Sequence, residues 1–242
     1  MADVVTRIDI EIGKKFAEYC KQNFPGIDYL IVDEESIADL GGNPKLEILK
    51  HDYAFIIDPI NETFPYRDKL PVWCISIGVW VKDKPLYGGI YAPGMQRIEY
   101  NDDDAAYIIE GAFTSWEWKK KIPILADDED SAKMYIMTSN SILTSRDWHE
   151  HKIPRTSFHC AVLSAMMVIS GKAIGFVGGD YLWDFAAFMP IGDKVGVNGY
   201  NFKTLEKSSF DTLSDKLQMP DYELVCCKKY LNCIKDNTEH RN

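Results

Sequence analysis

Short apolar segments that end in acidic residues constrain this chain more than any other feature. Residues 29–32 predict a buried strand that runs into an acidic turn containing Glu34, and residues 53–57 predict another that ends at Asp58. Ligands bind to α/β sheets beyond the carboxyl ends of the strands. We therefore expect carboxylates from distant parts of the sequence to meet at one edge of a sheet.

The remaining segments mix strands and helices. Apolar residues at helical spacing predict an amphipathic helix over residues 5–24, which Pro25-Gly26 ends. Residues 72–81 and 86–91 predict a β-hairpin. Further strands are expected at 133–138, 174–177 and 222–225. Further helices are expected after Thr63, at 160–170, from Trp183 and at 229–235. Asp184 is a possible N-cap of the helix that begins at Trp183-Asp184. This mixture predicts an α/β (α+β) fold.

Length and composition limit the number of domains and the kinds of partner. A chain of 242 residues with 46% hydrophobic and 26% charged residues is expected to form one globular domain, with approximate subdomains at 1–125 and 126–242. A formal net charge of −10 argues against nucleic acid as a partner, because phosphate backbones select basic surfaces. An acidic chain can still bind a phosphorylated metabolite if a divalent cation supplies the positive charge.

The sequence predicts a cytoplasmic protein that does not enter a membrane. Its first residues lack the apolar region of a secretory signal. The most apolar stretch, residues 158–169, is too short and too polar for a bilayer span of about 20 residues. The six cysteines have no C-x-x-C spacing, so we expect free thiols in a reducing compartment. Cys160 has no evident activating partner in its apolar surroundings, so we expect it to pack rather than to act as a nucleophile.

Glu34, Asp58 and Asp184 together suit a hard cation. Mg²⁺ prefers oxygen ligands and is usually bound by a few carboxylates, water and substrate phosphate. Asp58-Pro59-Ile60 is expected to form a rigid turn, which can direct a carboxylate and a backbone carbonyl toward one ion. A helix that begins after Thr63 would present free N–H groups to a phosphate. Each signal is weak alone, because an acid after a strand is more often a solvated turn residue.

Five short motifs occur in a fixed order along the chain. They are Asp3-Val4-Val5-Thr6-Arg7-Ile8-Asp9, Asp33-Glu34-Glu35-Ser36, Asp58-Pro59-Ile60-Asn61-Glu62-Thr63, Ile75-Ser76-Ile77-Gly78-Val79 and Trp183-Asp184-Phe185-Ala186-Ala187. In order and spacing this set resembles the D-x-V-T-x-x-D, G-E-E-S, D-P-[IL]-D-G-T, V-S-I-G-[LV] and W-D-x-A-A segments of the inositol monophosphatase superfamily, the Mg²⁺-dependent, Li⁺-sensitive phosphatases. The resemblance spans most of the chain, and five ordered motifs are far more specific than any one.

The resemblance implies a layered αβαβα sandwich, a homodimer and in-line attack of water on a phosphomonoester with two or three Mg²⁺ ions. Glu34 would bind metal and orient the attacking water, helped by the hydroxyl of Thr63. Asp58 would bridge two ions, and the Ile60 carbonyl would complete the first site. Asn61 and Asp184 would bind the second ion. Asp9 would belong to an outer acidic shell near a third, weaker ion. Glu62 and Thr63 would bind the phosphate.

Two departures from the family lie in the third motif. Asn61 replaces an Asp; its carbonyl oxygen can still bind a metal, but the loss of a negative charge predicts a weak second ion. Glu62 replaces a Gly whose N–H would contact the phosphate. A carboxylate ~4 Å from the phosphate would cost ~4 kcal/mol at an effective dielectric constant of ~20, and far less if it points outward. Glu62 can also swing inward and replace the charge that Asn61 lacks.

Other departures lie outside that motif. The family normally has a further helix before the first motif, so one wall of the fold is expected to be missing or supplied otherwise. His159-Cys160-Ala161-Val162 stands where the family has G-S-A-A, and Ile191-Gly192-Asp193 shortens an E-A-G-G segment. Both segments lie near the substrate side, so the choice of substrate does not carry over. Tyr181 and Trp183 flank a proposed metal ligand and are expected to line the pocket.

Two functions remain open from the sequence. The first is Mg²⁺-dependent hydrolysis of a small phosphomonoester, with inositol monophosphate as the default substrate and a nucleotide 3′-phosphate or fructose bisphosphate as alternatives. The second is a weakened or inactive member that binds metal or a phosphorylated ligand in a regulatory or structural role. Asn61 and Glu62 favour the second function. The retained acids and Thr63 favour the enzyme.

Overall fold

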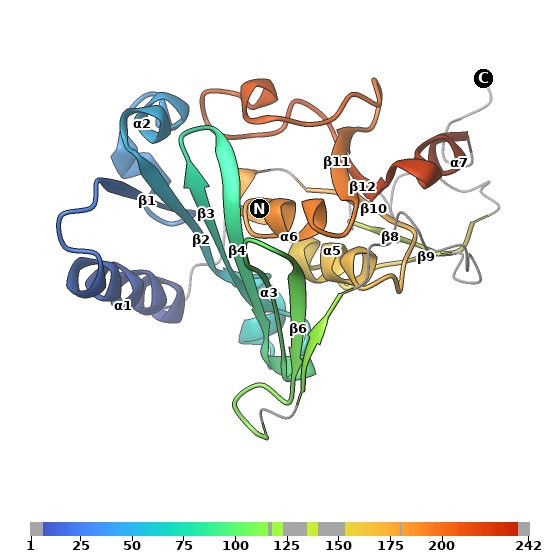
Figure 1. Cartoon of the computed structure of the whole chain (residues 1–242), viewed down its shortest axis with the longest axis horizontal. Coiled ribbons are helices and arrows are strands. Elements are labelled where there is room, and N and C mark those ends of the chain that lie inside the picture. Colours follow the sequence, from blue (N-terminus) through green and yellow to red (C-terminus); the bar gives the residue numbers. More distant parts are fainter. Residues whose placement is uncertain (1–6, 116–117, 123–134, 140–152, 180, 237–242) are drawn as a thin grey trace.

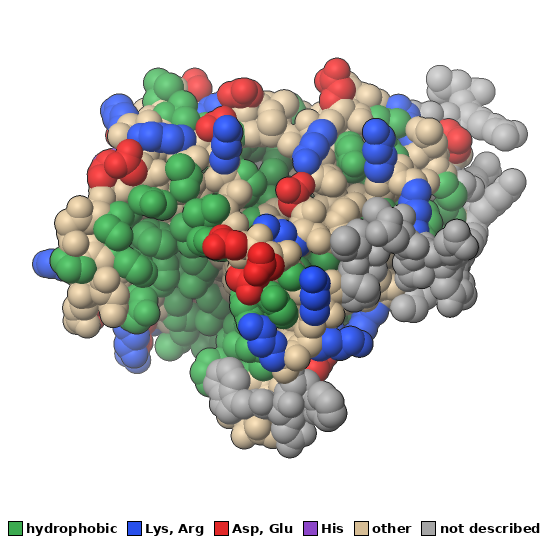
Figure 2. All heavy atoms as spheres, viewed as in Figure 1, with side chains coloured by type: hydrophobic (Ala, Val, Ile, Leu, Met, Phe, Trp, Pro, Cys, Tyr) green, Lys and Arg blue, Asp and Glu red, His purple; other side chains and the backbone are tan. Residues whose placement is uncertain are grey.

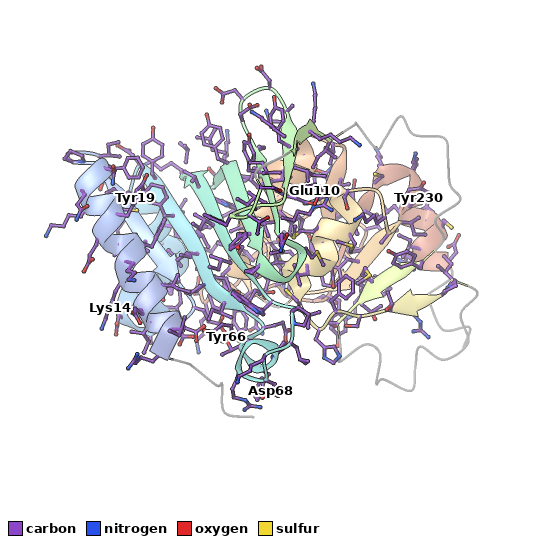
Figure 3. All side chains as sticks on the ribbon, turned by 90° about the horizontal axis from the view of Figure 1, so that it is seen from below. Lys14, Tyr19, Tyr66, Asp68, Glu110 and Tyr230 are labelled. Atoms are coloured by element: carbon purple, nitrogen blue, oxygen red, sulfur yellow. The ribbon has the colours of Figure 1, made fainter. Side chains whose placement is uncertain are left out.

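The computed structural model describes residues 7–115, 118–122, 135–139, 153–179 and 181–236. Its elements form five layers (Figure 1), namely helix α1, a first sheet, helices α5 and α6, a second sheet and helix α7. The view from below in Figure 3 repeats this order, with Tyr19 of α1 at one side and Tyr230 at the other. The arrangement confirms the predicted αβαβα sandwich. The helices are α1 Arg7–Asn23, α2 Pro44–Lys50, α3 Thr63–Arg67, α5 Ala161–Ile169, α6 Phe188–Asp193 and α7 Leu231–Asp236.

The first sheet contains seven strands that follow one another in chain order. β1 and β2 are parallel, and the later neighbours are antiparallel. The predicted hairpin is confirmed as β3 and β4. The strands are β1 Tyr29–Asp33, β2 Tyr53–Asn61, β3 Cys74–Val81, β4 Lys84–Ala92, β5 Arg97–Asn101, β6 Ala106–Glu110 and β7 Trp118–Lys121.

The second sheet contains five strands in the order β11-β12-β10-β8-β9. β10 is parallel to β8 and antiparallel to β12. All four residues of β10 are buried, as expected for a strand that is covered on both faces. The strands are β8 Ile136–Thr138, β9 Arg155–Thr156, β10 Gly175–Gly178, β11 Val197–Asn201 and β12 Glu223–Cys227.

The central helices are buried between the two sheets. All residues of α5 from Val162 to Ile169 are buried, as expected for a helix with no polar face. One hydrophobic core joins both sheets through these helices and includes Ile56 and Trp80 from the first sheet and Phe176 from the second. This shared core fixes the two sheets relative to each other. Functional side chains from both halves of the sequence can therefore be held at fixed positions.

The outer face of the first sheet is partly covered by α1. The rings of Phe16 and Phe24 lie 5.8 Å and 5.6 Å from the ring of Phe55 in β2. Lys14 and Tyr19, labelled in Figure 3, are exposed on α1. Along β3 buried residues alternate with half-buried ones, so the outer row of this strand is only partly covered by described residues. Figure 2 shows a broad hydrophobic area beside α1 on this side of the molecule.

Several elements differ from those predicted. Strands β5, β6, β7, β9 and β11 lie where no regular element was expected, because short strands with few residues of one period give weak signals. Helix α2 was not expected either. The strand expected at 133–138 is described from residue 135 and covers Ile136–Thr138. In place of a helix that begins at Trp183-Asp184, the chain forms the 3₁₀ turn Leu182–Asp184 (η5) and then α6. Across the described ranges, no helix is both long and apolar enough to cross a bilayer.

Candidate active site

The parallel pairing of β1 and β2 brings two predicted acids together. Asp33 and Ile57 are partners in the register of these strands. The residue that follows each of them is an acid, Glu34 after β1 and Asp58 within β2. The carboxylate of Asp33 accepts hydrogen bonds from the N–H and the hydroxyl of Ser36 at 2.8 Å and 2.5 Å, which holds the turn that carries Glu34.

Residues 58–60 lie inside β2 and not in the rigid turn that the sequence predicts. β2 continues to Asn61, and its pairing with β3 shifts by one residue between Asp58 and Asn61. Such a bulge accommodates Pro59, which has no N–H to donate to the neighbouring strand. The proline therefore acts as expected in restricting the backbone, but within a strand.

Asp58 lies at the centre of a group of acids and is 1% exposed. Its Oδ2 accepts a hydrogen bond from Asn61 Nδ2 at 2.6 Å, whereas its Oδ1 has no hydrogen-bond partner among the described residues. Burial raises the pKa of Asp58 well above its usual range. The charges of Glu34 and Asp184 raise this pKa further, and buried Asp9 of α1 adds a smaller effect. An ionised carboxylate here requires a positive charge beside it.

The turn η5 carries Asp184 to the site by packing closely on the first sheet. A Cβ atom at Gly78 of β3 would lie 2.5 Å from the carbonyl oxygen of Ala186, so only glycine allows this approach. Trp80 Nε1 donates a hydrogen bond to the same carbonyl oxygen at 3.1 Å. The fourth and fifth sequence motifs therefore pack against each other, which fixes the position of η5.

The sequence predicts Asp184 as the N-cap of a helix, but the structure places it otherwise. Its Oδ2 accepts a hydrogen bond at 3.1 Å from the N–H of Tyr181, which precedes it by three residues. Its Oδ1 accepts a hydrogen bond at 3.0 Å from Asn61 Nδ2. This second bond joins the third motif to the fifth, across 123 residues of sequence.

The side chain of Asn61 is turned opposite to the expected direction. Its amide nitrogen, and not its carbonyl oxygen, lies between Asp58 and Asp184. The carbonyl oxygen accepts hydrogen bonds from Cys160 Sγ at 2.8 Å and from the N–H of Val162 at 3.4 Å. The expectation that Asn61 offers this oxygen to a second ion is not met by the geometry.

Cys160 is buried at the N-cap of α5, where its sulfur accepts a hydrogen bond from the N–H of Leu163 at 3.3 Å. The sulfur of Cys74 lies 3.7 Å from it. Burial raises the pKa of the Cys160 thiol. A protonated, buried thiol suits the packing role that the sequence predicts, and its contact with Asn61 is an addition that the sequence did not reveal.

Glu62 occupies a backbone conformation that favours the glycine of the family motif. Its φ is 74° and its ψ is 69°, and a left-handed conformation costs a non-glycine residue roughly 1–2 kcal/mol. Burial, and to a smaller extent the charge of Asp184, raises the pKa of Glu62 to about 7. The neighbouring Thr63 hydroxyl donates to the carbonyl oxygen of Ile60 at 3.3 Å, so these two predicted site groups lie together.

A pocket of about 400 Å³ opens beside Glu34. The segment 37–44 forms one part of its wall, and Tyr181 and Trp183 form another, as predicted. The two aromatic rings stack with their centroids 4.6 Å apart. Lys216 adds a positive charge to the lining. The volume is in the range of small-molecule sites.

These residues fit a divalent cation on one side of Asp58. Its Oδ1 has no hydrogen-bond partner among the described residues. Glu34, which follows the neighbouring strand, and the Ile60 carbonyl, within the same strand, are further oxygen groups available to an ion. On the other side, the space between Asp58 and Asp184 holds the N–H donors of Asn61. In the part of the chain that is described, no three His, Cys, Asp or Glu side chains are grouped to hold a metal. A cation at Asp58 would therefore also use backbone oxygen and water, as Mg²⁺ commonly does.

The sequence matches the model of the inositol monophosphatase family over residues 1–219. The chain belongs to this family. Inositol monophosphatase 1 of Saccharomyces cerevisiae is 34% identical to it over 96 residues, which are 40% of this chain and 30% of that protein. Inositol-1-monophosphatase of Synechocystis is 31% identical over 96 residues, with the same shares. The matches thus span about a third of these inositol monophosphatases.

Solved structures of inositol monophosphatases share the fold. Staphylococcal inositol monophosphatase II has a TM-score of 0.72 at 16% identity, with 98% of this chain and 86% of that chain covered. A dual-specific inositol monophosphatase and NADP phosphatase, bound with D-inositol-1-phosphate, has a TM-score of 0.69 at 15% identity, with 98% and 87% covered. At such identity the likeness concerns the fold alone.

Three contributors to the site escaped prediction from the sequence. Cys160 was expected only to pack, and Trp80 carried no site signal. Their hydrogen bonds show that Trp80 holds η5 and that Cys160 holds Asn61. Lys216 lies in a polar segment without a motif, so no sequence signal marks it. The sequence signal that could have indicated the contact between Cys160 and Asn61 is the departure of His159-Cys160 from the family pattern.

Proposed function

We propose that this inositol monophosphatase family member hydrolyses a small phosphomonoester in a Mg²⁺-dependent reaction. The observation that carries the proposal is the buried Asp58, whose Oδ1 has no partner among the described residues and whose pKa is raised by burial and then by other acids. A divalent cation and a phosphate ester suit this environment together, because the cation offsets the charge of both. The names of the sequence relatives support the same activity.

The proposed roles begin with one ion at the Oδ1 side of Asp58, with Glu34 and the Ile60 carbonyl as further ligands. When bound, Mg²⁺ would lower the pKa of a water and neutralise the phosphoryl oxygens. Glu34 would orient the attacking water, helped by the Thr63 hydroxyl. The sequence predicts two or three ions, with a weak second one at Asn61 and Asp184 and a third near Asp9. We keep the third position as a proposal, whereas the orientation of the Asn61 amide argues against the second.

Phosphate binding at residues 62 and 63 is proposed through the backbone rather than the side chain of Glu62. The helix that follows, α3, has only five residues, so its dipole contributes little. The carboxylate of Glu62 would repel a phosphate when ionised. Its pKa of about 7 leaves a substantial protonated fraction at neutral pH, which reduces this repulsion.

The pocket beside Glu34 is the proposed position of the substrate's non-phosphate part. Inositol monophosphate is the default substrate, because the relatives are named for it. The stacked Tyr181 and Trp183 and the charge of Lys216 would also suit a flat or doubly anionic molecule. We further propose a homodimer, on the family resemblance. We propose a cytoplasmic location on the cysteine pattern.

A second candidate is a member that binds metal or a phosphorylated ligand without efficient turnover. The observation that favours it is the amide of Asn61, which directs N–H groups at Asp58 and Asp184 where the family motif has a carboxylate. Glu62 in place of glycine adds to this argument.

Titration of phosphate release with Mg²⁺ and Mn²⁺, over inositol monophosphate, a nucleotide 3′-phosphate, fructose bisphosphate and an aryl phosphate, separates the two candidates. The enzyme predicts metal-dependent release with at least one ester and none in EDTA. Binding of Mn²⁺ without release from any ester would support the second candidate. A protein that neither binds Mn²⁺ nor releases phosphate would contradict both candidate functions.

A further inference from the structure

The amide of Asn61 is held in one orientation by four contacts. Its two N–H bonds point to Asp58 Oδ2 at 2.6 Å and Asp184 Oδ1 at 3.0 Å. Its carbonyl oxygen accepts from Cys160 Sγ at 2.8 Å and the N–H of Val162 at 3.4 Å. An asparagine side chain has two donors and two acceptor positions, so this one is fully satisfied while only 6% exposed.

Turning the amide around is unfavourable on both sides. The carbonyl oxygen of Asn61 would then face two carboxylates, and its N–H groups would face the backbone N–H of Val162. That backbone N–H belongs to the first turn of the buried helix α5 and cannot move aside without moving the helix. The sulfur of Cys160 is itself held by the N–H of Leu163, which leaves the thiol hydrogen directed at Asn61.

Two ionised carboxylates that lie close together repel each other unless a positively polarised group, a cation or a proton lies between them. Between Asp58 and Asp184 the N–H groups of Asn61 already supply it, through a hydrogen bond to each. A hydrogen bond from an amide to a carboxylate is stronger than one between neutral groups. By contrast, Asp58 Oδ1 on the opposite side has no such donor among the described residues.

We infer that the Asn61 amide takes the place of a cation between Asp58 and Asp184, and that Cys160 is the positioning residue that keeps it there. The position between these two carboxylates is then closed to a divalent cation, and the proposed ion on the Oδ1 side of Asp58 is unaffected. This inference rests on the proposed function for that remaining ion, and it replaces the weak second ion with a position closed to metal. Asn61 and Cys160 are therefore a matched pair, and a change in either reopens the position.

The experiment counts bound Mn²⁺, from the electron paramagnetic resonance signal of the free ion, in wild type and in Asn61→Asp. We expect Asn61→Asp to bind one more Mn²⁺ than wild type, at least about a hundredfold more tightly than wild type does at that position, because a carboxylate replaces two donors. Equal numbers of bound Mn²⁺ in the two proteins would overturn the inference.

Melting temperatures in EDTA and in Mg²⁺ give a second readout that needs no turnover. Asn61→Asp adds a carboxylate to Asp58 and Asp184, so in EDTA it should melt below wild type. Mg²⁺ should raise its melting temperature by more than that of wild type, because a tighter ligand stabilises more. The same melting temperatures and the same Mg²⁺ shifts in both proteins would contradict the inference.

Cys160→Ala and Cys160→Ser test the positioning role with a matched pair. Serine keeps a donor to the Asn61 carbonyl oxygen, so Cys160→Ser should bind Mn²⁺ as wild type does. Alanine removes the donor, so Cys160→Ala should gain a further, weaker Mn²⁺. Identical Mn²⁺ binding in these two variants would remove Cys160 from the account. If Asn61→Asp does not fold, a further Mn²⁺ in Cys160→Ala but not in Cys160→Ser supports the inference, and no further Mn²⁺ in either variant overturns it.

The outcomes separate this inference from the proposed function. If wild type binds no Mn²⁺ and Asn61→Asp binds one, the closed position is supported and the proposed ion at Asp58 Oδ1 is not. If wild type and Asn61→Asp bind the same number of Mn²⁺ and wild type releases phosphate with Mg²⁺, the closed position is wrong while the metal-dependent activity still stands.

Discussion

Each of the two sheets buries a carboxylate, and the two carboxylates differ in what surrounds them. Asp58 in β2 is 1% exposed, is near the charges of other acids and has an oxygen without a partner among the described residues. Glu223 in β12 is 2% exposed, and its Oε2 accepts a hydrogen bond from the Ser208 hydroxyl at 2.6 Å. Burial alone raises the pKa of Glu223, to about 7.

The difference separates a site from a buried acid. A lone buried carboxylate can stay protonated and needs no ion. Several acids that lie close together repel one another when ionised, and a cation between them relieves the repulsion. The charges of Glu34 and Asp184 act on Asp58, and its Oδ1 has no partner among the described residues. Its Oδ2 resembles the carboxylate of Glu223, because Asn61 donates a hydrogen bond to it.

Replacement of each carboxylate should give the largest contrast. Asp58→Ala is expected to lower phosphate release by about a thousandfold or more, because the proposed ion loses its central ligand. Glu223→Gln, the matched control in the other sheet, should stay within about twofold of wild type. Phosphate release at saturating Mg²⁺ is the measurement. Unchanged turnover in a folded Asp58→Ala protein would remove the metal assignment.

Restoring the family motif should raise phosphate release, whereas Asp58→Ala lowers it. Asn61→Asp with Glu62→Gly supplies a negative ligand, removes a carboxylate near the phosphate and lets the backbone approach it. Removal of an unfavourable ~3 kcal/mol would raise phosphate release by about a hundredfold.

Each single change should help less than the double one if Glu62 compensates for the charge that Asn61 lacks. The three variants are compared with inositol monophosphate and an aryl phosphate. A double variant no faster than wild type would place the defect elsewhere, and the binding-protein candidate would then be preferred.

The pH dependence of stability should report Glu223. The pKa of its carboxyl is about 7 in the folded protein and its usual value is 4.5, so the folded protein holds a proton over this interval that the unfolded chain releases. Stability from this group therefore falls as the pH rises from about 4.5 to about 7, by up to roughly 3 kcal/mol. Urea denaturation of wild type and Glu223→Gln across this range tests it. The variant should show the flatter profile, and parallel profiles would speak against it.

The smallest expected effect is on the backbone at residue 62. Glu62→Gly should stabilise the protein by about 1 kcal/mol through relief of its left-handed conformation. Lys69→Gly is a matched control, because Lys69 has a φ of 60° outside the acidic group. Glu62→Gln keeps the strain and removes the charge. If Glu62→Gly gains no more than Glu62→Gln, charge and not backbone strain limits stability there. Chemical denaturation measures all three.

Much of the fold was accessible from local patterns. The 3.6-residue period of α1 and the two apolar segments on either side of residues 82–85 predicted these elements directly. Helix α2 was missed although its signal is present, since Asn43 caps it through a hydrogen bond to the N–H of Leu46 and Pro44 follows. The Gly-rich surroundings of this segment concealed the signal.

The sequence predicted which acids form the site but not how the side chain of Asn61 is oriented in it. The meeting of Glu34 with Asp58 follows from parallel strands, and the sequence predicted it. The direction of the Asn61 amide depends on Cys160, which is 99 residues away, so no local pattern contains it. The bulge at Pro59 likewise depends on the pairing of β2 with β3, which a single segment does not specify.

A crystal soaked in Mn²⁺, with anomalous scattering recorded at the manganese edge, tests the central claim most directly. We expect a manganese peak within ligand distance of Asp58 Oδ1, Glu34 and the Ile60 carbonyl. We expect no peak between Asp58 Oδ2 and Asp184, where the amide nitrogen of Asn61 should remain. A manganese peak between those two carboxylates, with the Asn61 carbonyl oxygen turned toward it, would contradict the account.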